Sequence, residues 1–194
     1  MEEVTICRSN RSMKDFFKVL GVPAQLVIEA ESLSVAFREA GKRAHPDAGG
    51  GDEEFARLGE AFEILSSPSK RLKHWLELRG TPAETRGAVD PHLMDLFSEV
   101  GEAIQQAESL IRRRDETKSA LGLALLERET HVCREAVGKA VALVEKAVVR
   151  ECGGFSEMQQ ALDLDVDAAS KSARNLAFLE KWRVGLRGVF GRLV

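Results

Sequence analysis

Apolar side chains recur every three to four residues along most of the chain, and the strict alternation typical of β-strands is almost absent. In the N-terminal part this period predicts short helices over 13–20, 29–44, 52–66 and 69–79. In the remainder it predicts three longer helices, one beginning at Asp90-Pro91 and two others spanning 116–150 and 165–189. The pattern therefore predicts an all-α protein.

The helices predicted over 29–44 and 52–66 both carry an apolar stripe at helical spacing. Only a short loop separates them, so we expect them to pack against each other as an antiparallel hairpin. Phe37 and Phe62 lie near the middle of the two stripes. We expect these two aromatic residues at the centre of the hairpin core.

The loop of this hairpin holds the tripeptide His45-Pro46-Asp47, followed closely by three glycines. Proline disfavours helical dihedral angles at the residue before it, so the first helix should end here. Proline also fixes its own φ, which would present its two neighbours rigidly. The tripeptide therefore predicts an interaction point at the hairpin tip, and an ordinary solvated loop histidine is the alternative.

A basic face of the first hairpin helix leads to this loop. Arg38 and Lys42 are four residues apart and share a side of the helix, with Arg43 beside them. Such a face suits an acidic partner surface. The alternative is an ordinary solvated helix face on which Glu39 pairs with Arg43.

Two breaks in the helical pattern divide the chain. Residues 1–12 are polar and predict a flexible leader, and residues 81–90 contain Pro and Gly without a period and predict a linker. One domain is therefore expected over 13–80, and a helical bundle over 91–194. Three long helices with short connections are typical of a three-helix bundle.

Composition excludes several function classes. The chain is 44% apolar and 30% charged with a net charge of −3, so its charge balance predicts no nucleic-acid partner. No apolar run approaches the ~20 residues that a membrane span needs. The acidic start Met1-Glu2-Glu3 lacks a signal-peptide core, and the three cysteines are widely spaced, as in reducing compartments. We expect a cytoplasmic protein without a membrane partner.

The sequence predicts neither a metal nor a cofactor. Three alternating acids, Asp163, Asp165 and Asp167, are spaced as in a calcium loop, but Ala168 and Arg174 stand where that loop needs glycine and glutamate. These acids should favour a helix start instead. Histidines and cysteines lack the spacing of zinc ligands, and the loop histidine and aspartate have no nucleophile at a matching position. We therefore expect a protein that is not an enzyme.

Several segments taken together resemble a known family. The segments that resemble a J-domain are, in the order of the chain, Asp15–Val22, Ala36–Arg38, His45–Asp47 and Glu60–Arg71. The segments that follow resemble the HscB family, which are the J-protein co-chaperones of iron–sulfur cluster assembly. These segments are Arg71–Gly80, Leu93-Met94 and Asn175–Lys181. The likeness extends from Met13 to Leu193.

The resemblance implies a function in two parts. The J-domain would dock on the ATP form of a DnaK-type heat-shock chaperone of the HscA class and stimulate its ATPase. The bundle would hold the scaffold protein on which clusters are built, which is of the IscU class. The residues implied in chaperone binding are His45, Pro46, Asp47, Arg38, Lys42 and Arg43.

The resemblance also implies an apolar scaffold-binding patch in the bundle, made of Leu93, Met94, Phe97 and Phe178. Leu93 and Phe97 also lie on the apolar seam of their helix, so core packing is the alternative for both. Met94 lies off this seam, which favours exposure. Phe178 flanks the apolar stripe of the last helix and has the same two alternatives.

In the family, the scaffold-binding patch also carries acidic residues. The aligned positions in this chain are the uncharged Ser98, Gly101 and Gln105. The apolar half of the expected contact is retained, and the electrostatic half is not. A J-protein for a different client, with the bundle as a general adaptor, is therefore the alternative hypothesis.

Overall fold

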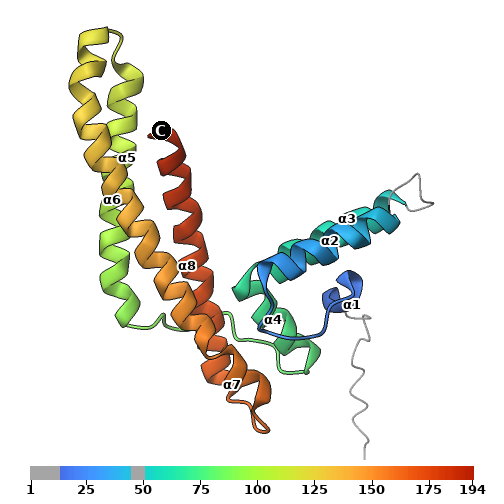
Figure 1. Ribbon diagram of the computed structural model, residues 1–194. Helices are drawn as coiled ribbons and strands as arrows, with labels where there is room; N and C mark the ends of the chain where they lie inside the picture. Colours follow the sequence, from blue (N-terminus) through green and yellow to red (C-terminus); the bar gives the residue numbers. More distant parts are fainter. Residues whose placement is uncertain (1–13, 45–50) are drawn as a thin grey trace, which may run out of the picture.

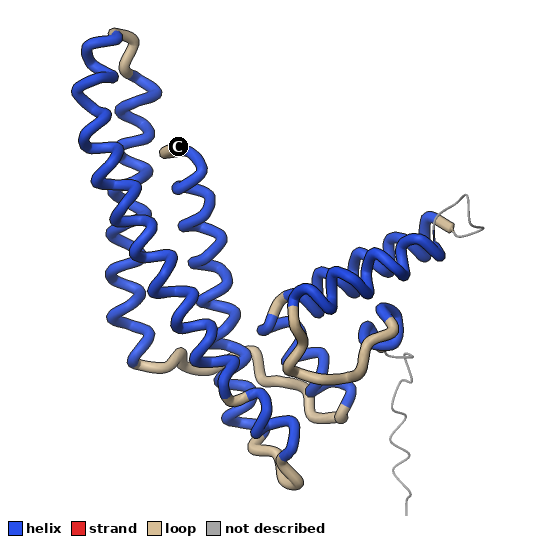
Figure 2. The backbone as a smooth tube through the Cα atoms, viewed as in Figure 1, coloured by secondary structure: helices blue, strands red, loops and turns tan. Residues whose placement is uncertain are grey.

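The computed structural model describes residues 14–44 and 51–194, and every regular element within them is an α-helix (Figure 1, Figure 2). The helices are α1 (Phe16–Leu20), α2 (Ala30–Ala44), α3 (Asp52–Ser66), α4 (Pro68–Leu78), α5 (His92–Glu116), α6 (Ala120–Gly153), α7 (Phe155–Gln160) and α8 (Val166–Arg192). The prediction of an all-α fold is confirmed.

The helices form two arms that meet at α4 (Figure 1). In the longer arm α5, α6 and α8 all contact one another, as expected for a three-helix bundle. In the other arm α2 and α3 form the predicted hairpin, and α1 packs along one side of it. Helix α4 contacts both α3 and α8, so it joins the two arms.

The hairpin core lies on the side that α1 covers. Phe17 of α1, Leu33 of α2 and Leu58 of α3 are all buried there. Phe37 and Phe62 do contact each other, with ring centroids 4.7 Å apart, but both are only half-buried. They therefore flank the core rather than form its centre, because no helix in the described part of the chain packs over their side of the hairpin.

The apolar seam of α5 is buried in the bundle as expected, with one exception. Leu93, Val100 and Ile111 are almost fully buried, whereas Phe97 is 53% exposed. With 3.6 residues per turn, Phe97 lies at the edge of the stripe that the other seam residues define. The side chain therefore points past the contact with α8 instead of into the core.

Two parts of the helical pattern differ from the sequence-based expectation. Helix α6 begins at Ala120 rather than near 116, because the Ser119 hydroxyl caps it by accepting a hydrogen bond from the Gly122 amide at 3.0 Å. The six-residue helix α7 was not predicted, since it is too short to show a period. Its Phe155 is 1% exposed and anchors the turn between α6 and α8.

The contact between α4 and α8 fixes the corner of the molecule. The Glu180 carboxylate on α8 accepts hydrogen bonds from the hydroxyls of Ser67 and Ser69, at 2.7 and 2.6 Å, and from the Ser69 amide at 3.2 Å. These groups form the N-terminus of α4, where the helix dipole favours a negative charge. A side chain of the bundle thus caps a helix of the other arm.

The segment predicted as a linker is held along α8. The Asp90 amide donates to the Asn175 side chain at 3.2 Å, and Arg174 donates to the Glu84 carbonyl at 2.9 Å. The Asp90 carboxylate also pairs with Lys171 at 2.6 Å. That hydrogen bond from Lys171 lowers the pKa of Asp90 to about 2. These contacts, like the Glu180 cap, hold the two arms in one relative orientation.

Candidate protein-docking surfaces

Two exposed surfaces carry most of the residues that the sequence singled out, one on each arm. Within residues 14–44 and 51–194, no three or more His, Cys, Asp or Glu side chains are grouped to hold a metal ion. No helix in the same ranges is long and apolar enough to cross a membrane.

The basic face of α2 is exposed along its last two turns. Arg38 pairs with Glu31 at 3.3 Å, and Lys42 pairs with Glu39 at 2.9 Å, while Arg43 is exposed beside them. The alternative interpretation of this face paired Glu39 with Arg43, whereas in the structure Glu39 pairs with Lys42. The hydrogen bond from Lys42 lowers the pKa of the Glu39 carboxyl.

Exposed ion pairs of this kind contribute only about 0.2–1 kcal/mol each. The two cations are therefore held loosely, and the acids of a docking partner can replace their present partners at small cost. This side of α2 is suited to an acidic surface.

The predicted tip residues His45, Pro46 and Asp47 lie outside the described residues. The last residue of α2, Ala44, is buried, and Gly51 at the start of α3 is exposed. Figure 1 places both helix ends at the far end of the hairpin arm, away from the bundle. The basic face therefore leads toward the free end of this arm.

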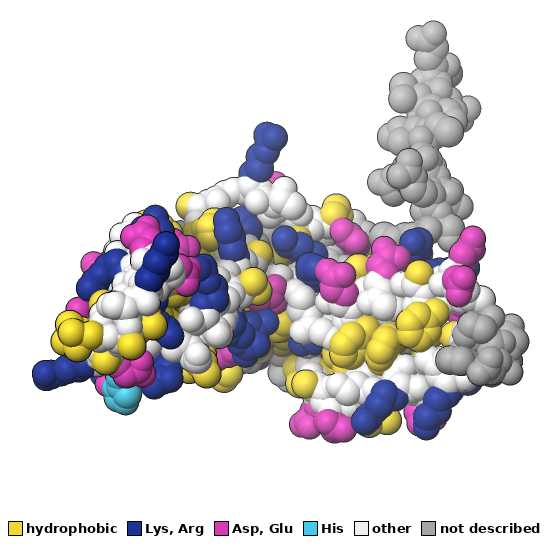
Figure 3. Space-filling view, turned by 90° about the horizontal axis from the view of Figure 1, so that it is seen from above, with side chains coloured by type: hydrophobic (Ala, Val, Ile, Leu, Met, Phe, Trp, Pro, Cys, Tyr) yellow, Lys and Arg dark blue, Asp and Glu magenta, His cyan; other side chains and the backbone are white. Residues whose placement is uncertain are grey.

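An apolar band runs along the same arm on the side that α1 leaves open (Figure 3). Phe37 contacts Phe62 and also Phe55, whose ring centroid is 6.4 Å away. Phe55 is 49% exposed, although its spacing from the buried Leu58 places it on the apolar stripe of α3. We call Phe37, Phe55 and Phe62 the hairpin aromatic stripe. Sequence spacing alone could not separate this stripe from the core.

The predicted patch on the bundle is an exposed aromatic cluster between α5 and α8. Met94 is 56% exposed, Phe97 is 53% exposed and Phe178 is 43% exposed. Trp182 of α8 joins the two phenylalanines, with ring centroids 5.7 Å from Phe97 and 6.3 Å from Phe178. We call these four residues the bundle aromatic patch.

Leu93 does not belong to the surface of this patch. Its side chain is 1% exposed, so of the two alternatives for Leu93 the structure places it in the core. Leu93 lies in the first turn of α5, next to the exposed Met94, and its own side chain does not reach the surface of the patch.

Trp182 of α8 is a member of the patch that the sequence analysis did not single out. It falls on the inward stripe of α8 by spacing, yet it is only half-buried. Its ring packs across the surface between Phe97 and Phe178.

The edge of the patch on α5 is neutral. Ser98 and Gln105 are exposed, and Gly101 between them is half-buried, with no atom within 4 Å of where its Cβ would be. A side chain at each position would reach solvent. The three positions therefore form an accessible border without charge, as their residue types predicted.

Comparison with known proteins relates both arms to one family. A family model described as the DnaJ domain matches residues 15–74, which cover α1 to α3 and most of α4. The tetratricopeptide repeat and J domain-containing co-chaperone DNJ1 of Cryptococcus neoformans is 46% identical over 61 residues, but these are 31% of this chain and only 11% of that protein. This likeness is confined to the N-terminal arm.

A likeness over nearly the whole chain comes from two other proteins. The co-chaperone protein HscB homolog of Cupriavidus taiwanensis is 30% identical over 180 residues, which span 86% of this chain and 88% of that protein. The structure of the chaperone HscB from Vibrio cholerae matches with a TM-score of 0.57 and 22% identity, covering 93% of this chain and all of that one, and so shares its fold. Since the hairpin arm and the bundle are both included, the chain belongs to the HscB family of J-domain proteins.

Proposed function

We propose that this protein is a non-enzymatic co-chaperone with two partners. Its J-domain stimulates the ATPase of a DnaK/HscA-type heat-shock chaperone, and its bundle delivers the iron–sulfur cluster scaffold protein, of the IscU class, to that chaperone. The observation that carries the proposal is the presence of two exposed surfaces of different chemistry on two arms joined by fixed contacts. A cytoplasmic location belongs to the same proposal.

The chaperone contact combines the basic face of α2, the tripeptide His45-Pro46-Asp47 and the hairpin aromatic stripe. Arg38, Lys42 and Arg43 attract an acidic surface and orient the hairpin as it approaches. The tip residues His45-Pro46-Asp47 then engage the partner, with the Asp47 carboxylate accepting a charge-assisted hydrogen bond from an arginine. The exposed ring of Phe55 supplies apolar contact beside the basic face.

ATPase stimulation is tested by single-turnover hydrolysis with the cognate chaperone. The wild-type chain should raise the hydrolysis rate, and His45→Gln should abolish the increase. The matched control is His131→Gln, a change of an exposed histidine on α6 that should leave stimulation intact. No stimulation by the wild type, or equal stimulation by His45→Gln, would contradict the J-domain role.

The basic face is tested by charge reversal. Arg38→Glu with Lys42→Glu should weaken chaperone binding about tenfold or more, because both changes put a negative charge opposite an acidic surface. Wild-type binding should also weaken as salt rises. Arg150→Glu, an exposed change on α6, is the control. Affinity that is unchanged by the double reversal and by salt would remove the basic face from the contact.

The client contact is tested at the exposed members of the bundle aromatic patch. Met94→Ala, Phe97→Ala and Phe178→Ala together should weaken binding of the cluster scaffold by about 30-fold or more, since buried aromatic anchors dominate protein interfaces. Val149→Ala removes another exposed apolar side chain, on α6, and should have no effect. Isothermal titration with the purified scaffold gives both values, and equal affinities would discard the patch.

The second candidate function is a J-protein for a different client, and the neutral border of the patch favours it. Ser98, Gly101 and Gln105 offer no charge to a basic scaffold surface. Under this alternative, a pull-down with the full chain recovers the chaperone but no cluster scaffold. Recovery of the scaffold, lost in the Met94/Phe97/Phe178 variant, would exclude it.

A further inference from the structure

The open angle between the two arms holds a groove of about 830 Å³, at the corner where α3, α4 and α8 meet (Figure 1). Phe62 of α3 lines one side of it, and Ala177 and Val184 of α8 line the other. Val184 is 70% exposed, so the apolar wall on α8 is open to solvent. We call this hollow the inter-arm groove.

The inter-arm groove is continuous with both apolar surfaces of the molecule. Phe62 also belongs to the hairpin aromatic stripe, which runs along the other arm toward the bundle (Figure 3). On α8, Ala177 precedes Phe178 of the bundle aromatic patch, and Lys181 follows it by three residues, on the same side of the helix. A client seated on the patch therefore needs to cross only the width of α8 to enter the groove.

The inter-arm groove has a positive charge. Its acids are both engaged within the chain, since Glu180 caps α4 and Glu63 pairs with Lys70. Lys73 and Lys181 also line the groove, and neither forms an ion pair with any residue in the described ranges. Two cations are therefore available beside an apolar wall, and together they favour a partner with carboxylates.

The bundle aromatic patch thus has borders of different charge on its two helices. On α5 its border is formed by Ser98, Gly101 and Gln105, which carry no charge. On α8 its border is the exposed Lys181, next to the groove. A client that occupies the patch finds a charge complement for its acids on the α8 side.

We propose that the inter-arm groove binds a short acidic segment of the client that docks on the bundle aromatic patch. Apolar side chains of this segment pack on Phe62 and Val184, and its carboxylates pair with Lys73 and Lys181. The inference rests on the proposed function, because the client is the protein that the patch holds. It adds the chemistry of the client contact, which is a segment that combines acidic and apolar residues. This segment lies in the open angle beside the hairpin that engages the chaperone.

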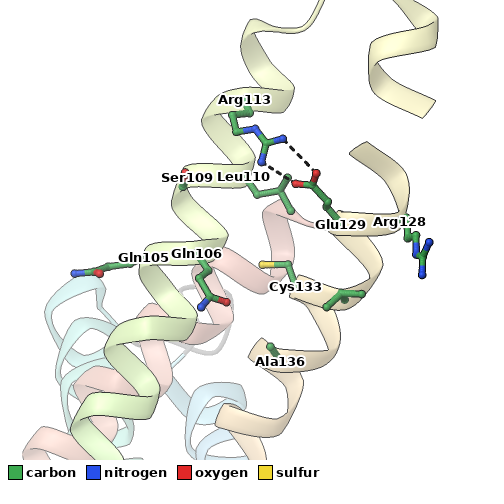
Figure 4. A pocket seen from close by; sticks show the side chains of 10 residues that line it. Gln105, Gln106, Ser109, Leu110, Arg113, Arg128, Glu129, Cys133 and Ala136 are labelled. Atoms are coloured by element: carbon green, nitrogen blue, oxygen red, sulfur yellow. Dashed lines mark hydrogen bonds and ion pairs between the residues drawn. The ribbon is translucent and has the colours of Figure 1, made fainter. Parts of the chain in front are cut away.

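A second groove, of about 600 Å³ between α5 and α6, differs from the inter-arm groove in its charges (Figure 4). Arg113 donates to Glu129 across it at 2.7 and 3.3 Å, so these two charges satisfy each other. Val132 on the outer side of α6 lines it and is 60% exposed. Lys139 and Lys146 are exposed elsewhere on α6, away from the inter-arm groove. These two lysines provide a matched control for changes of charge.

Fluorescence anisotropy with the full chain and a labelled peptide of alternating leucine and aspartate tests the groove directly. The wild type should bind this peptide at least tenfold more tightly than a peptide with lysine in place of aspartate. Lys73→Glu with Lys181→Glu should bind the acidic peptide at least tenfold more weakly, because both cations become repulsive charges. Lys139→Glu with Lys146→Glu makes the same change of net charge and should bind as the wild type does. Equal affinities of the two double variants would overturn the proposal.

Isothermal titration with the purified cluster scaffold separates this inference from the proposed function. Lys73→Glu with Lys181→Glu should weaken scaffold binding about tenfold, and the control pair should not. Scaffold affinity that is equal in the wild type and in this variant would overturn the inference and leave the proposed function standing. A loss of chaperone affinity without a loss of scaffold affinity would assign the groove to the chaperone, and would also overturn it. A wild type that binds the acidic peptide through these lysines but binds no scaffold would refute the proposed function alone.

Discussion

At the scale of single residues, the buried His74 shows how one neutral side chain joins two elements. The Phe16 amide at the start of α1 donates to His74 Nε2 at 3.1 Å, so this nitrogen must be unprotonated. The rings of Phe16 and Phe17 lie 4.8 and 5.6 Å from the imidazole. Burial lowers the pKa of His74, and the nearby charges of Glu77 and Asp15 oppose this shift.

The lowered pKa predicts that acid destabilises this arm. The unfolded chain binds the proton more readily than the folded chain, so the contribution of His74 is complete above its ordinary pKa of 6.5. It is lost as the pH falls from there through the lower pKa of the folded state. Urea midpoints should therefore drop between about pH 7.5 and about pH 5.5, and His74→Gln should flatten this dependence.

His131→Gln is the control for this pH dependence, because His131 is exposed and should leave the wild-type slope unchanged. An identical slope in the wild type and in His74→Gln would mean that other groups cause the acid sensitivity. The sequence contains no signal for the role of His74. Its two aromatic partners lie far from it in the chain and meet it only when α1 packs on α4.

At the scale of elements, local sequence determined where several helices begin. Asp15, Ser67 and Asp165 each accept a hydrogen bond from a backbone amide of the first turn that follows. Of the three alternating acids near the start of α8, Asp165 acts in this way. Asp165 caps the helix through the Ala168 amide at 2.9 Å, and Asp167 lies in the first turn.

Removal of the α8 cap should have a measurable cost. Asp165→Ala should lower the free energy of unfolding by about 1 kcal/mol, because the Ala168 amide loses its acceptor. Asp163→Ala removes an exposed carboxylate that lies before the cap, and its effect should stay within about 0.5 kcal/mol. Urea denaturation followed by circular dichroism measures both. Equal losses would show that net charge, and not the cap, sets the stability of this end.

At the scale of the whole molecule, Glu180 links the two arms through one carboxylate. It caps α4 from α8, and Arg71 lies buried beside this contact with its guanidinium donating to the Leu65 carbonyl. The basic face of α2 and the bundle aromatic patch are therefore held at a set angle. A client bound to the bundle would be presented to the chaperone in one orientation.

Loss of this cap should loosen the angle between the arms. Glu180→Ala should lower the free energy of unfolding by about 2 kcal/mol, because charged hydrogen bonds to Ser67 and Ser69 are lost. Small-angle X-ray scattering should also give a broader distribution of interatomic distances. Glu60→Ala, which breaks an exposed pair with Lys14, should change neither quantity. An unchanged scattering curve for Glu180→Ala would show that apolar contacts alone hold the corner.

The sequence by itself determined the family and every helix except the six-residue α7, because these depend on residue spacing over a few turns. Tertiary structure decided which side of each apolar stripe is covered. Leu93 and Phe97 fall on the same seam, yet one is buried and the other is exposed. Likewise α6 has two apolar faces, and only the positions of α5 and α8 decide which one meets solvent. Spacing defines a face of a helix, whereas burial depends on elements distant in the chain that cover it.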